Sequence, residues 1–539
     1  MNRVMVSHLG DRKNFDGFEG AFVFPTQKGR YTGGIGCIDF ASLYPSIIRS
    51  LNISPETYRG KVLIQYKSPD GHSLLPINEK NELPFNIFDD KEAKADNVAG
   101  YYLKLPDNRR KKVTLETLRN FVDKHGIYTT NNTIFLKHEE KWGVISKWCE
   151  YFYNQRKVTK KKMLQIFRDL HDNNKTFSKK EKKRLEDEAE NLNSRQGAFK
   201  NMINSIYGQM GSSYSPIANL DIAQTVTRLG RACNTYASNF VLKSFQENYD
   251  PTYQGYRIST LEDDDPRRDN ADKVDVIAVG GDTDSQFINL QVVTDYMKKR
   301  DDLPEKIRDW PQEKRQELWD TINDFVNKDV NEFVRNMVHN YTKTNQQNVL
   351  TYELEYMADC GLYESKKHYF VHKIFEEGVA VDKIKVTGIA LKKNETDKSM
   401  KSVLQDIYEG AVLKDWNETN YQDYISNIYE TFKTLSIDQI AFWKGYNTAR
   451  EAVGFLTMGV GTTGIAKACT YYNQILEKLN LTKKYDQILV GNKTRFVYLK
   501  STNEYGIDCI AYLPGSWPKE FDNIFEVDYP KMFDKIILD

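Results

Sequence analysis

Residues 35–48 read IGCIDFASLYPSII, and this stretch decides the fold. Residues 35–40 form a short apolar run, which predicts a strand with Asp39 at its end. Pro45 stands just beyond this run, and proline is tolerated in the first turn of a helix. The stretch therefore predicts a strand that runs directly into a helix.

The predicted strand-to-helix turn carries the first candidate site. Backbone amides of Ser42, Leu43 and Tyr44 would be exposed there, and a helix start favours an anion such as a triphosphate. In that position the ring of Tyr44 would lie beside the sugar of a bound nucleotide. The alternative is a tyrosine packed in the core at the junction.

A second acidic stretch lies far along the chain, where residues 280–285 read GGDTDS. The flanking apolar runs predict a β-hairpin over residues 274–290, with Asp282 and Asp284 at its turn. If this hairpin lies beside the strand that ends at Asp39, carboxylates from two rigid strand ends converge. Such carboxylates suit Mg²⁺, and a pair of ions can clamp the oxygens of a phosphoryl transfer. The alternative is a plain turn, because Asp and Ser favour turns.

Residues 144–211 have a helical pattern that is interrupted near residues 171–174, which predicts two long antiparallel helices. Lys200, Asn204 and Tyr207 recur at i, i+4 and i+7, so they share one helix face. Arg156 and Lys160 lie one turn apart on the other helix. If the helices are antiparallel, three cations converge on one polyphosphate. The alternative is a solvated basic face, which we favour only for residues 179–184.

The remaining pattern is mixed. We expect a β-rich insertion over residues 55–140, a helix over 219–247, an acidic exposed loop over 259–271, helices to about 341 and strands over 351–390. The last part should mix helices with a β-like segment at 495–513. Lys366, Lys367 and Tyr369 place a basic pair beside an aromatic ring on a predicted strand, which suits the backbone of a DNA duplex.

Composition sets the outer limits. A chain of 539 residues is expected to form several domains. The net charge of +1 neither supports nor excludes a nucleic-acid partner, because acidic metal ligands and basic phosphate contacts cancel. The sequence contains no run of about eighteen or more apolar residues, so it predicts no transmembrane helix. The 6 cysteines are scattered singly, which indicates buried or free thiols in a reducing compartment, so we expect a cytoplasmic protein.

These motifs, in this order, resemble those of family B DNA polymerases. Residues 39–46, 200–208 and 282–285 resemble that family's three polymerase motifs, and residues 366–369 resemble its Lys-Lys-x-Tyr motif. Residues 52–57, 154–157, 470–473 and 508–512 resemble the branch found in T-even-type bacteriophages. The resemblance runs from about residue 18 to the end of the chain.

The resemblance implies a template-directed polymerase that adds dNTPs to a primer 3′-hydroxyl with two Mg²⁺ ions, for which Mn²⁺ can substitute. Asp39, Asp284 and the carbonyl of Phe40 would hold the metals, with Asp282 tuning the site and Glu355 assisting nearby. Lys200 would act in catalysis, as a proton donor to pyrophosphate. The remaining implied contacts are to nucleotide, through Ser42, Leu43, Tyr44, Arg156, Lys160, Lys200, Asn204 and Tyr207, and to primer-template DNA, through Lys366, Lys367 and Tyr369.

The implied fold is the α/β right hand, with an antiparallel palm sheet and long antiparallel fingers helices. Residues 1–35 would form a linker segment, 36–143 and 212–392 the palm, 144–211 the fingers and 393–539 the thumb. The alternative functions are a catalytically inactive polymerase-like scaffold and one subunit of an obligate complex. The first is disfavoured because the expected carboxylates and cations are present.

Two features depart from the family pattern. Gly280 stands where the family usually has a tyrosine, so the hairpin's contact to the primer is expected to differ. No Asp-x-Glu pair of the exonuclease type precedes Asp39. We therefore expect the 3′–5′ exonuclease on a separate polypeptide that docks on the apolar residues 18–25, alongside other phage replication proteins in a bacterial host. The alternatives are that this segment packs on its own palm and that the chain is a piece of a longer enzyme.

Overall fold

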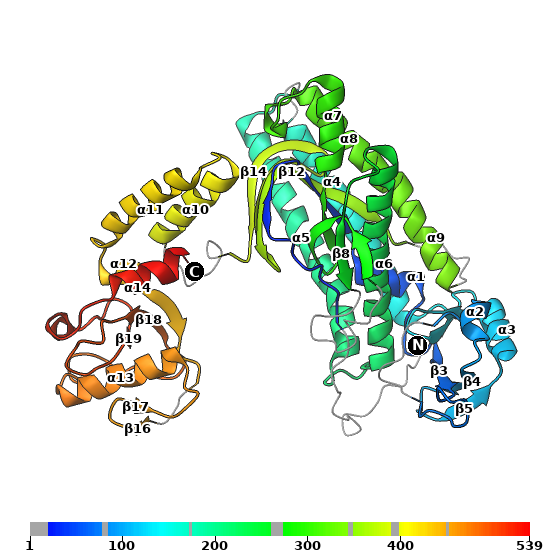
Figure 1. Cartoon of the computed structure of the whole chain (residues 1–539), viewed down its shortest axis with the longest axis horizontal. Coiled ribbons are helices and arrows are strands. Elements are labelled where there is room, and N and C mark those ends of the chain that lie inside the picture. The colour runs from blue at the N-terminus through cyan, green and yellow to red at the C-terminus, as the bar shows by residue number, and fades with distance from the viewer. Residues whose placement is uncertain are drawn as a thin grey trace. The chain divides into compact units, whose positions relative to one another are not determined.

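The computed structural model describes residues 20–77, 85–171, 175–259, 273–342, 349–389, 398–448 and 452–538. The chain divides into two compact units (Figure 1). The first comprises Met1–Gln27, Gly33–Met357 and Phe375–Val379, and the second comprises Lys28–Thr32, Ala358–Ile374 and Ala380–Asp539. None of the described helices is long and apolar enough to cross a membrane.

The central sheet has the strand order β10-β11-β2-β12-β13-β14, and β1 also pairs with β12. The strands are β1 (Gly29–Tyr31), β2 (Ile35–Phe40), β10 (Ala278–Asp282), β11 (Ser285–Asn289), β12 (Tyr352–Ser365), β13 (His368–Glu376) and β14 (Val379–Thr387). β2 is antiparallel to β11, and Ile35 and Ile38 are fully buried in it. The division between the two units falls within β12.

β2 leads into helix α1 (Leu43–Ser50), as the sequence predicts. α1 packs against helix α6 (Leu220–Asn248), which begins where the side chain of Asn219 accepts the Ile222 N–H. A Cβ atom at Gly230 would lie 3.2 Å from Leu43 and 3.3 Å from Tyr44, so glycine gives the two helices room to approach. The helices that follow the β10–β11 hairpin are α7 (Gln291–Asp301), α8 (Gln312–Phe325) and α9 (Asn331–Thr342).

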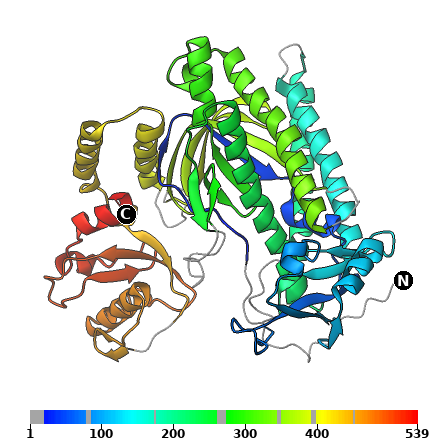
Figure 2. The same ribbon diagram turned by 45° about the vertical axis from the view of Figure 1, so that its right-hand side comes forward.

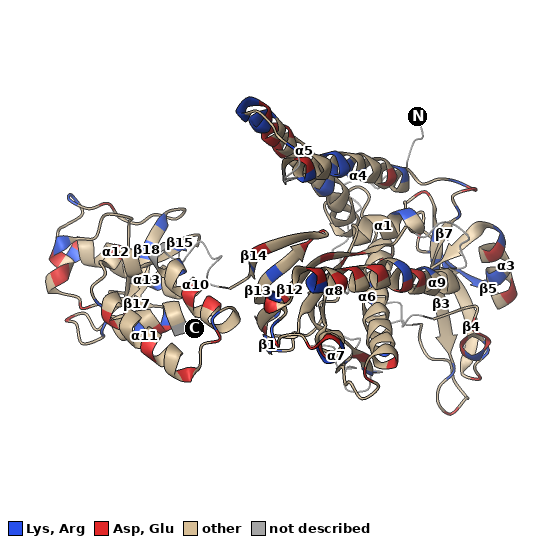
Figure 3. Ribbon diagram, turned by 90° about the horizontal axis from the view of Figure 1, so that it is seen from above, with Lys and Arg blue, Asp and Glu red and all other residues tan. Residues whose placement is uncertain are grey.

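The two long helices are α4 (Val144–His171) and α5 (Lys179–Gly211), and they pack along one another (Figure 2). α5 begins with a capping box, in which Ser178 and Glu181 satisfy each other's backbone amides. The first turns of α5 expose a dense group of cations (Figure 3). This exposure agrees with the solvated basic face expected for residues 179–184.

The region before α4 is β-rich, as the sequence predicts. It forms a five-stranded sheet in the order β5-β4-β3-β7-β6 with helices α2 (Asp90–Ala93) and α3 (Leu115–His125). Its strands are β3 (Tyr58–Tyr66), β4 (Val98–Lys104), β5 (Arg110–Val113), β6 (Gly126–Tyr128) and β7 (Thr133–Leu136). One face holds an apolar core that includes Val62, Ile64 and Tyr101.

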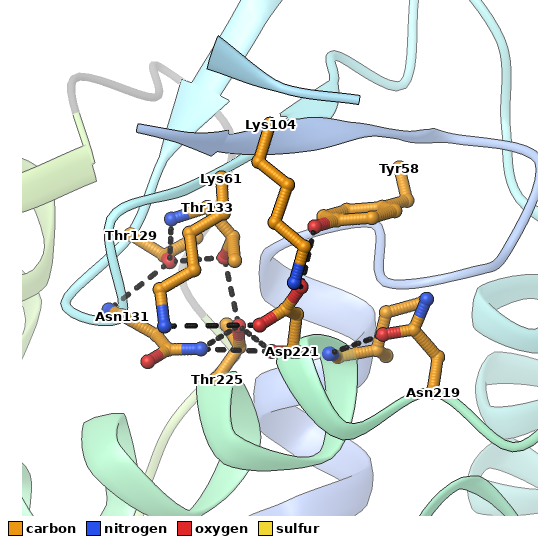
Figure 4. Close-up of polar contacts among 10 residues, drawn as sticks. Tyr58, Lys61, Lys104, Thr129, Asn131, Thr133, Asn219, Asp221 and Thr225 are labelled. Carbon is orange, nitrogen blue, oxygen red and sulfur yellow. Dashed lines mark hydrogen bonds and ion pairs between the residues drawn. The ribbon is translucent and has the colours of Figure 1, made fainter. Parts of the chain in front are cut away.

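A polar cluster joins the other face of this sheet to the start of α6 (Figure 4). Asp221 of α6 lies 3.7 Å from the ammonium of Lys61 and 3.3 Å from that of Lys104, and Tyr58 donates to it at 3.1 Å. Asn131 donates to the backbone carbonyl of Asp221 at 2.8 Å. These contacts hold the five-stranded sheet against α6, which also packs against α1.

The second unit contains helices, a smaller sheet and a large apolar core. The core lies among α13 (Gly464–Lys478) and the strands β15 (Phe442–Gly445), β18 (Lys493–Tyr498) and β19 (Cys509–Tyr512). Its further elements are α10 (Lys398–Val412), α11 (Glu418–Phe432), α12 (Ile437–Ile440), α14 (Tyr529–Phe533), β16 (Ala452–Gly454) and β17 (Thr457–Met458). This mixture agrees with the prediction for the last part of the chain.

Two local expectations are wrong. The hairpin expected over residues 274–290 starts later, because β9 (Lys273–Val276) leaves it and pairs with β8 (Tyr256–Ser259). Docking of a partner on residues 18–25 requires exposed rings, but Phe22 and Phe24 are buried with Ile258 and Val276 in a core of their own unit, which agrees with the alternative that this segment packs on its own chain. Residues 18–19 and most of the predicted acidic loop lie outside the described residues.

Candidate active site

The turn between β10 and β11 brings the predicted carboxylates together. Asp39 of β2 is directly opposite Ser285 of β11, and Asp282 pairs with the same serine across the hairpin. The Phe40 N–H donates to the carbonyl of Asp284 at 3.1 Å, which ties the end of β2 to the turn. Antiparallel register therefore places Asp39, Asp282 and Asp284 at one edge of the sheet, as the sequence predicts.

The turn concentrates negative charge in a half-buried place. Burial raises the pKa of Asp284, and the nearby charges of Asp282 and Glu355 raise it further, while Lys200 acts in the opposite direction. Glu355 lies on β12 and accepts the thiol of Cys37 at 3.4 Å. The ionised form of Asp284 is thus disfavoured by its surroundings, which a bound cation would reverse.

A buried polar network that the sequence analysis did not predict supports the turn between β10 and β11. Asn234 of α6 donates to the carbonyl of Thr283 at 2.8 Å and accepts the hydroxyl of Tyr352 at 2.6 Å. Gln286 donates to the same hydroxyl at 2.6 Å, and all three side chains are at most 1% exposed. The ring of Tyr352 stacks on Phe40, with centroids 3.7 Å apart. This network fixes the position of the acidic turn against both α6 and β12.

The two glycines before the turn differ in what they allow. A Cβ atom at Gly281 would run into the backbone carbonyl of Ser285 and lie 2.8 Å from Phe24, so this position requires glycine. At Gly280 the nearest atoms to a Cβ would be Phe287 at 3.6 Å and Thr26 at 3.7 Å, which is ordinary contact. The chain therefore has room for a side chain's first atom at the position where the family usually has tyrosine.

The start of α1 meets a cation from α4. Ser42 has a left-handed backbone, with φ of 64°, and its side chain makes no cap to the helix. Instead its hydroxyl accepts the Arg156 guanidinium at 3.0 Å, and Gln196 of α5 accepts the same side chain at 3.4 Å. Arg156 of α4 thus reaches the start of α1 through Ser42. The side chain of Leu43 is buried.

Tyr44 and Tyr207 lie together, with ring centroids 4.5 Å apart and planes tilted by 52°. Burial raises the pKa of both phenols, that of Tyr207 to about 12, so both remain neutral at physiological pH. This contact joins the α1 start to the face of α5 that carries Lys200 and Asn204, both of which are exposed. Of the three residues on this predicted face, Tyr207 is the one that contacts the α1 start.

Lys160 takes a partner that the sequence did not indicate. Its ammonium lies 2.6 Å from the carboxylate of Glu377, in the turn between β13 and β14. Arg156, one helical turn earlier, reaches Ser42 instead. Of the three cations expected to converge, Arg156 and Lys200 lie by the acidic turn or the α1 start, and Lys160 is held by Glu377.

In the second unit, the predicted DNA-binding residues lie at the turn between β12 and β13. Lys366 and Lys367 are exposed, and Lys367 has a φ of 64°. Tyr369 is 7% exposed and stacks on Tyr363 with centroids 5.5 Å apart. The exposed pair is thus presented by a turn that this aromatic stack supports. His368 bonds the carbonyl of Lys366 at 2.8 Å.

The donor set at the acidic turn fits a magnesium ion in part. Within the described ranges, no group of three His, Cys, Asp or Glu side chains forms a complete metal site. Magnesium is usually held by one or two carboxylates, with waters and substrate phosphates in its other positions. The oxygen donors of Asp39 and Asp284 and the raised pKa of Asp284 therefore fit an ion that is bound together with substrate. The 6 cysteine side chains are buried, and none of them forms a disulfide.

Comparison with known proteins defines the class. Residues 1–308 match the family model described as DNA polymerase family B, and the chain belongs to that family. It is 23% identical over 549 residues to the DNA-directed DNA polymerase of Enterobacteria phage T4, a match that covers 96% of this chain and 54% of that protein. It is also 26% identical over 441 residues to the DNA polymerase of Pyramimonas orientalis virus, covering 79% and 30% respectively. The chain thus spans about half or less of the length of these relatives.

Proposed function

We propose that this chain is a template-directed DNA polymerase that adds dNTPs to a primer 3′-hydroxyl and releases pyrophosphate. The observation that carries the proposal is the convergence of Asp39, Asp282 and Asp284 at one sheet edge, with Lys200 close enough to influence the pKa of Asp284. Phosphoryl transfer depends mainly on positioning and charge stabilisation, which such a site can supply. The family and its relatives support the same activity.

Asp39, Asp284 and the carbonyl of Phe40 would hold Mg²⁺, or Mn²⁺ in its place. Bound ions of this kind neutralise charge on the phosphates and activate the attacking hydroxyl. Asp282 would tune the site through its charge beside Asp284. The rigid support from Asn234 and Tyr352 keeps these oxygens fixed before substrate arrives, which reduces the cost of reorganisation during the reaction.

The triphosphate would lie between the α1 start and the two long helices. Arg156, Lys160 and Lys200 would bind its phosphates, and Lys200 would donate a proton to the leaving pyrophosphate. The backbone of residues 42–44 would meet the same phosphates. Tyr44, held by Tyr207, would exclude a ribose 2′-hydroxyl, and Asn204 and Tyr207 would line the nascent base pair.

The finer assignments stand as part of the same proposal. Lys366, Lys367 and Tyr369 would hold the primer end, and the palm, fingers and thumb would divide as the sequence indicates. A separate exonuclease polypeptide and other phage replication proteins in a bacterial host would be its partners. Mismatch excision by the chain alone, and by a mixture with a candidate exonuclease, tests this part.

Primer extension with the isolated chain, a primer-template and Mg²⁺ tests the activity. The proposal expects template-directed addition of nucleotides, and an inactive scaffold would add none.

Tyr44→Ala should raise the use of ribonucleotides relative to matched deoxynucleotides, because the ring would no longer fill the space of a 2′-hydroxyl. An unchanged ratio would make Tyr44 a packing residue alone.

A further inference from the structure

The ion pair between Lys160 and Glu377 links a long helix to a hairpin turn. Lys160 lies one helical turn after Arg156 on α4, so both cations face the same side of the helix. Arg156 reaches Ser42 at the α1 start, whereas Lys160 reaches Glu377 at 2.6 Å. The two neighbouring cations of the proposed phosphate site therefore have different partners.

Glu377 has an uncommon backbone conformation. It and Gly378 form the two-residue turn between β13 and β14, with φ values of 48° and 81°. Such turns favour Asn-Gly or Asp-Gly, and glutamate with positive φ is uncommon. A residue in a disfavoured backbone conformation is a candidate for a functional role.

The turn is also anchored next to the acidic site. The Glu377 N–H donates to the backbone carbonyl of Glu355, on β12, at 2.8 Å. The side-chain carboxylate of Glu355 raises the pKa of Asp284. From the other side, Phe375 stacks on Trp319 of α8 with centroids 5.4 Å apart. The carboxylate of Glu377 is thus presented to Lys160 by a fixed support, and α4 provides the other half of the contact.

We infer that Glu377 is a positioning residue that occupies Lys160 until the phosphates of an incoming nucleotide replace it. The inference rests on the proposed function, because it takes Lys160 as a phosphate contact. A triphosphate carries more negative charge than one carboxylate, so it can take over the ammonium, whereas weaker anions compete less well. The pair is partly exposed, at 30% for Lys160 and 35% for Glu377, so its effect on nucleotide affinity is modest.

Kinetics of single-nucleotide insertion test this role. Glu377→Gln removes the competing charge, so the KM for dNTP should fall by about two- to fivefold while kcat stays near the unmodified value. Glu377→Asn should lower KM equally and also suit the turn, so its melting temperature should not fall. A lower kcat, or a KM that is unchanged or raised, would indicate a structural role and overturn the inference.

A double-mutant cycle shows whether the effect acts through Lys160. In a Lys160→Ala background, Glu377→Gln should no longer change KM. Glu376→Gln is the matched control, because it removes the same charge one residue earlier. An equal fall in KM in the Lys160→Ala background, or with Glu376→Gln, would overturn the inference.

Equilibrium binding separates this inference from the proposed function. Calorimetry with dATP, Ca²⁺ and a primer-template requires no turnover. Binding of dATP that is about two- to fivefold tighter in Glu377→Gln would support the role of Glu377 in occupying Lys160, even if the unmodified chain fails to extend a primer. Normal extension with equal dATP affinity in both proteins would leave the polymerase activity standing and reject the role of Glu377.

Discussion

Two aspartate environments in the first unit show opposite uses of charge. At Asp221 two lysines and a tyrosine surround one carboxylate, and Lys61 is only 2% exposed (Figure 4). At Asp284 two further carboxylates, Asp282 and Glu355, act on the group and raise its pKa beyond the effect of burial. Asp221 lies in the first turn of α6 and Asp284 in the turn between β10 and β11, and the signs of the neighbouring charges distinguish the two sites.

This difference separates a structural contact from a candidate active site. A carboxylate that pairs with buried cations stabilises the folded chain, and removing it leaves a buried cation behind. Crowded carboxylates cost folding energy, and they are retained where another property depends on them. The comparison therefore predicts that substitutions at the two aspartates have opposite effects on activity and stability.

The largest expected effect is on catalysis at the acidic turn. Asp39→Asn or Asp284→Asn should reduce the rate of primer extension by at least about 10²–10³-fold, because each removes a charge that acts in the transition state. DNA binding should survive, since duplex affinity comes mainly from dispersed phosphate contacts. The melting temperature of Asp284→Asn should stay level or rise, because its ionised form is disfavoured. Extension near the unmodified rate in either variant would contradict the assignment.

Asp221→Asn should produce the reverse pattern. Losing the carboxylate beside buried Lys61 should lower the free energy of unfolding by about 3 kcal/mol. This is measured on the unfolding transition of the first unit. Extension at low temperature should persist, because Asp221 lies outside the acidic turn. Asp324→Asn is the matched control, since its pair with Lys328 is exposed and should contribute little. Equal stability of the two variants would remove the distinction between the clusters.

Arg156→Ala should weaken use of the nucleotide without affecting stability much. Losing one charge-assisted phosphate contact should cost about 2 kcal/mol, roughly thirtyfold in kcat/KM. Lys183→Ala, on the exposed start of α5, removes the same charge outside the site. If the single-turnover rate depends on nucleotide concentration in the same way in both variants, Arg156 is part of a solvated basic face and does not bind the nucleotide.

The glycine pair tests the shape of the acidic turn apart from its charge. Gly281→Ala should destabilise the chain by about 1–3 kcal/mol, because its Cβ would meet the Ser285 carbonyl and Phe24. Gly280→Ala should change the melting temperature little, since its Cβ finds ordinary contacts. Gly280→Tyr then shows whether the usual family residue improves the primer contact. Equal melting temperatures for the two alanine variants would mean that the turn relaxes freely.

A smaller, pH-dependent effect is expected in the second unit. His372 bonds Asp359 at 2.7 Å and Asp382 at 2.6 Å. Burial lowers the pKa of His372, but the two carboxylates raise it more, so its folded pKa lies above the ordinary value. Its stabilisation is therefore fully present below about pH 6.5 and is lost as pH rises through the folded pKa. Melting curves of the unmodified chain and His372→Gln should converge at high pH, and a gap that widens with pH would contradict the sign.

The elements around the site could be predicted because their signals are local. The strand-to-helix stretch at 35–48 and the GGDTDS turn each carry their own pattern, and α4 and α5 follow from helical periodicity. The support beneath the turn could not be predicted, because Tyr352 lies 118 positions from Asn234 and 66 from Gln286. Lys160 and Glu377 are 217 positions apart, so their pairing depends on tertiary structure. The burial of Phe22 and Phe24 likewise depends on β8 and β9, whose pairing was not predicted.

Binding of Mn²⁺ tests the central claim most directly, because the claim is that the crowded carboxylates hold divalent ions. Electron paramagnetic resonance of Mn²⁺ can follow bound ions in the presence of primer-template and dNTP. The account predicts that Asp39→Asn and Asp284→Asn lose this binding, while Asp221→Asn keeps it at a temperature where all variants are folded. Undiminished Mn²⁺ binding by Asp284→Asn, or an equal loss in Asp221→Asn, would contradict it.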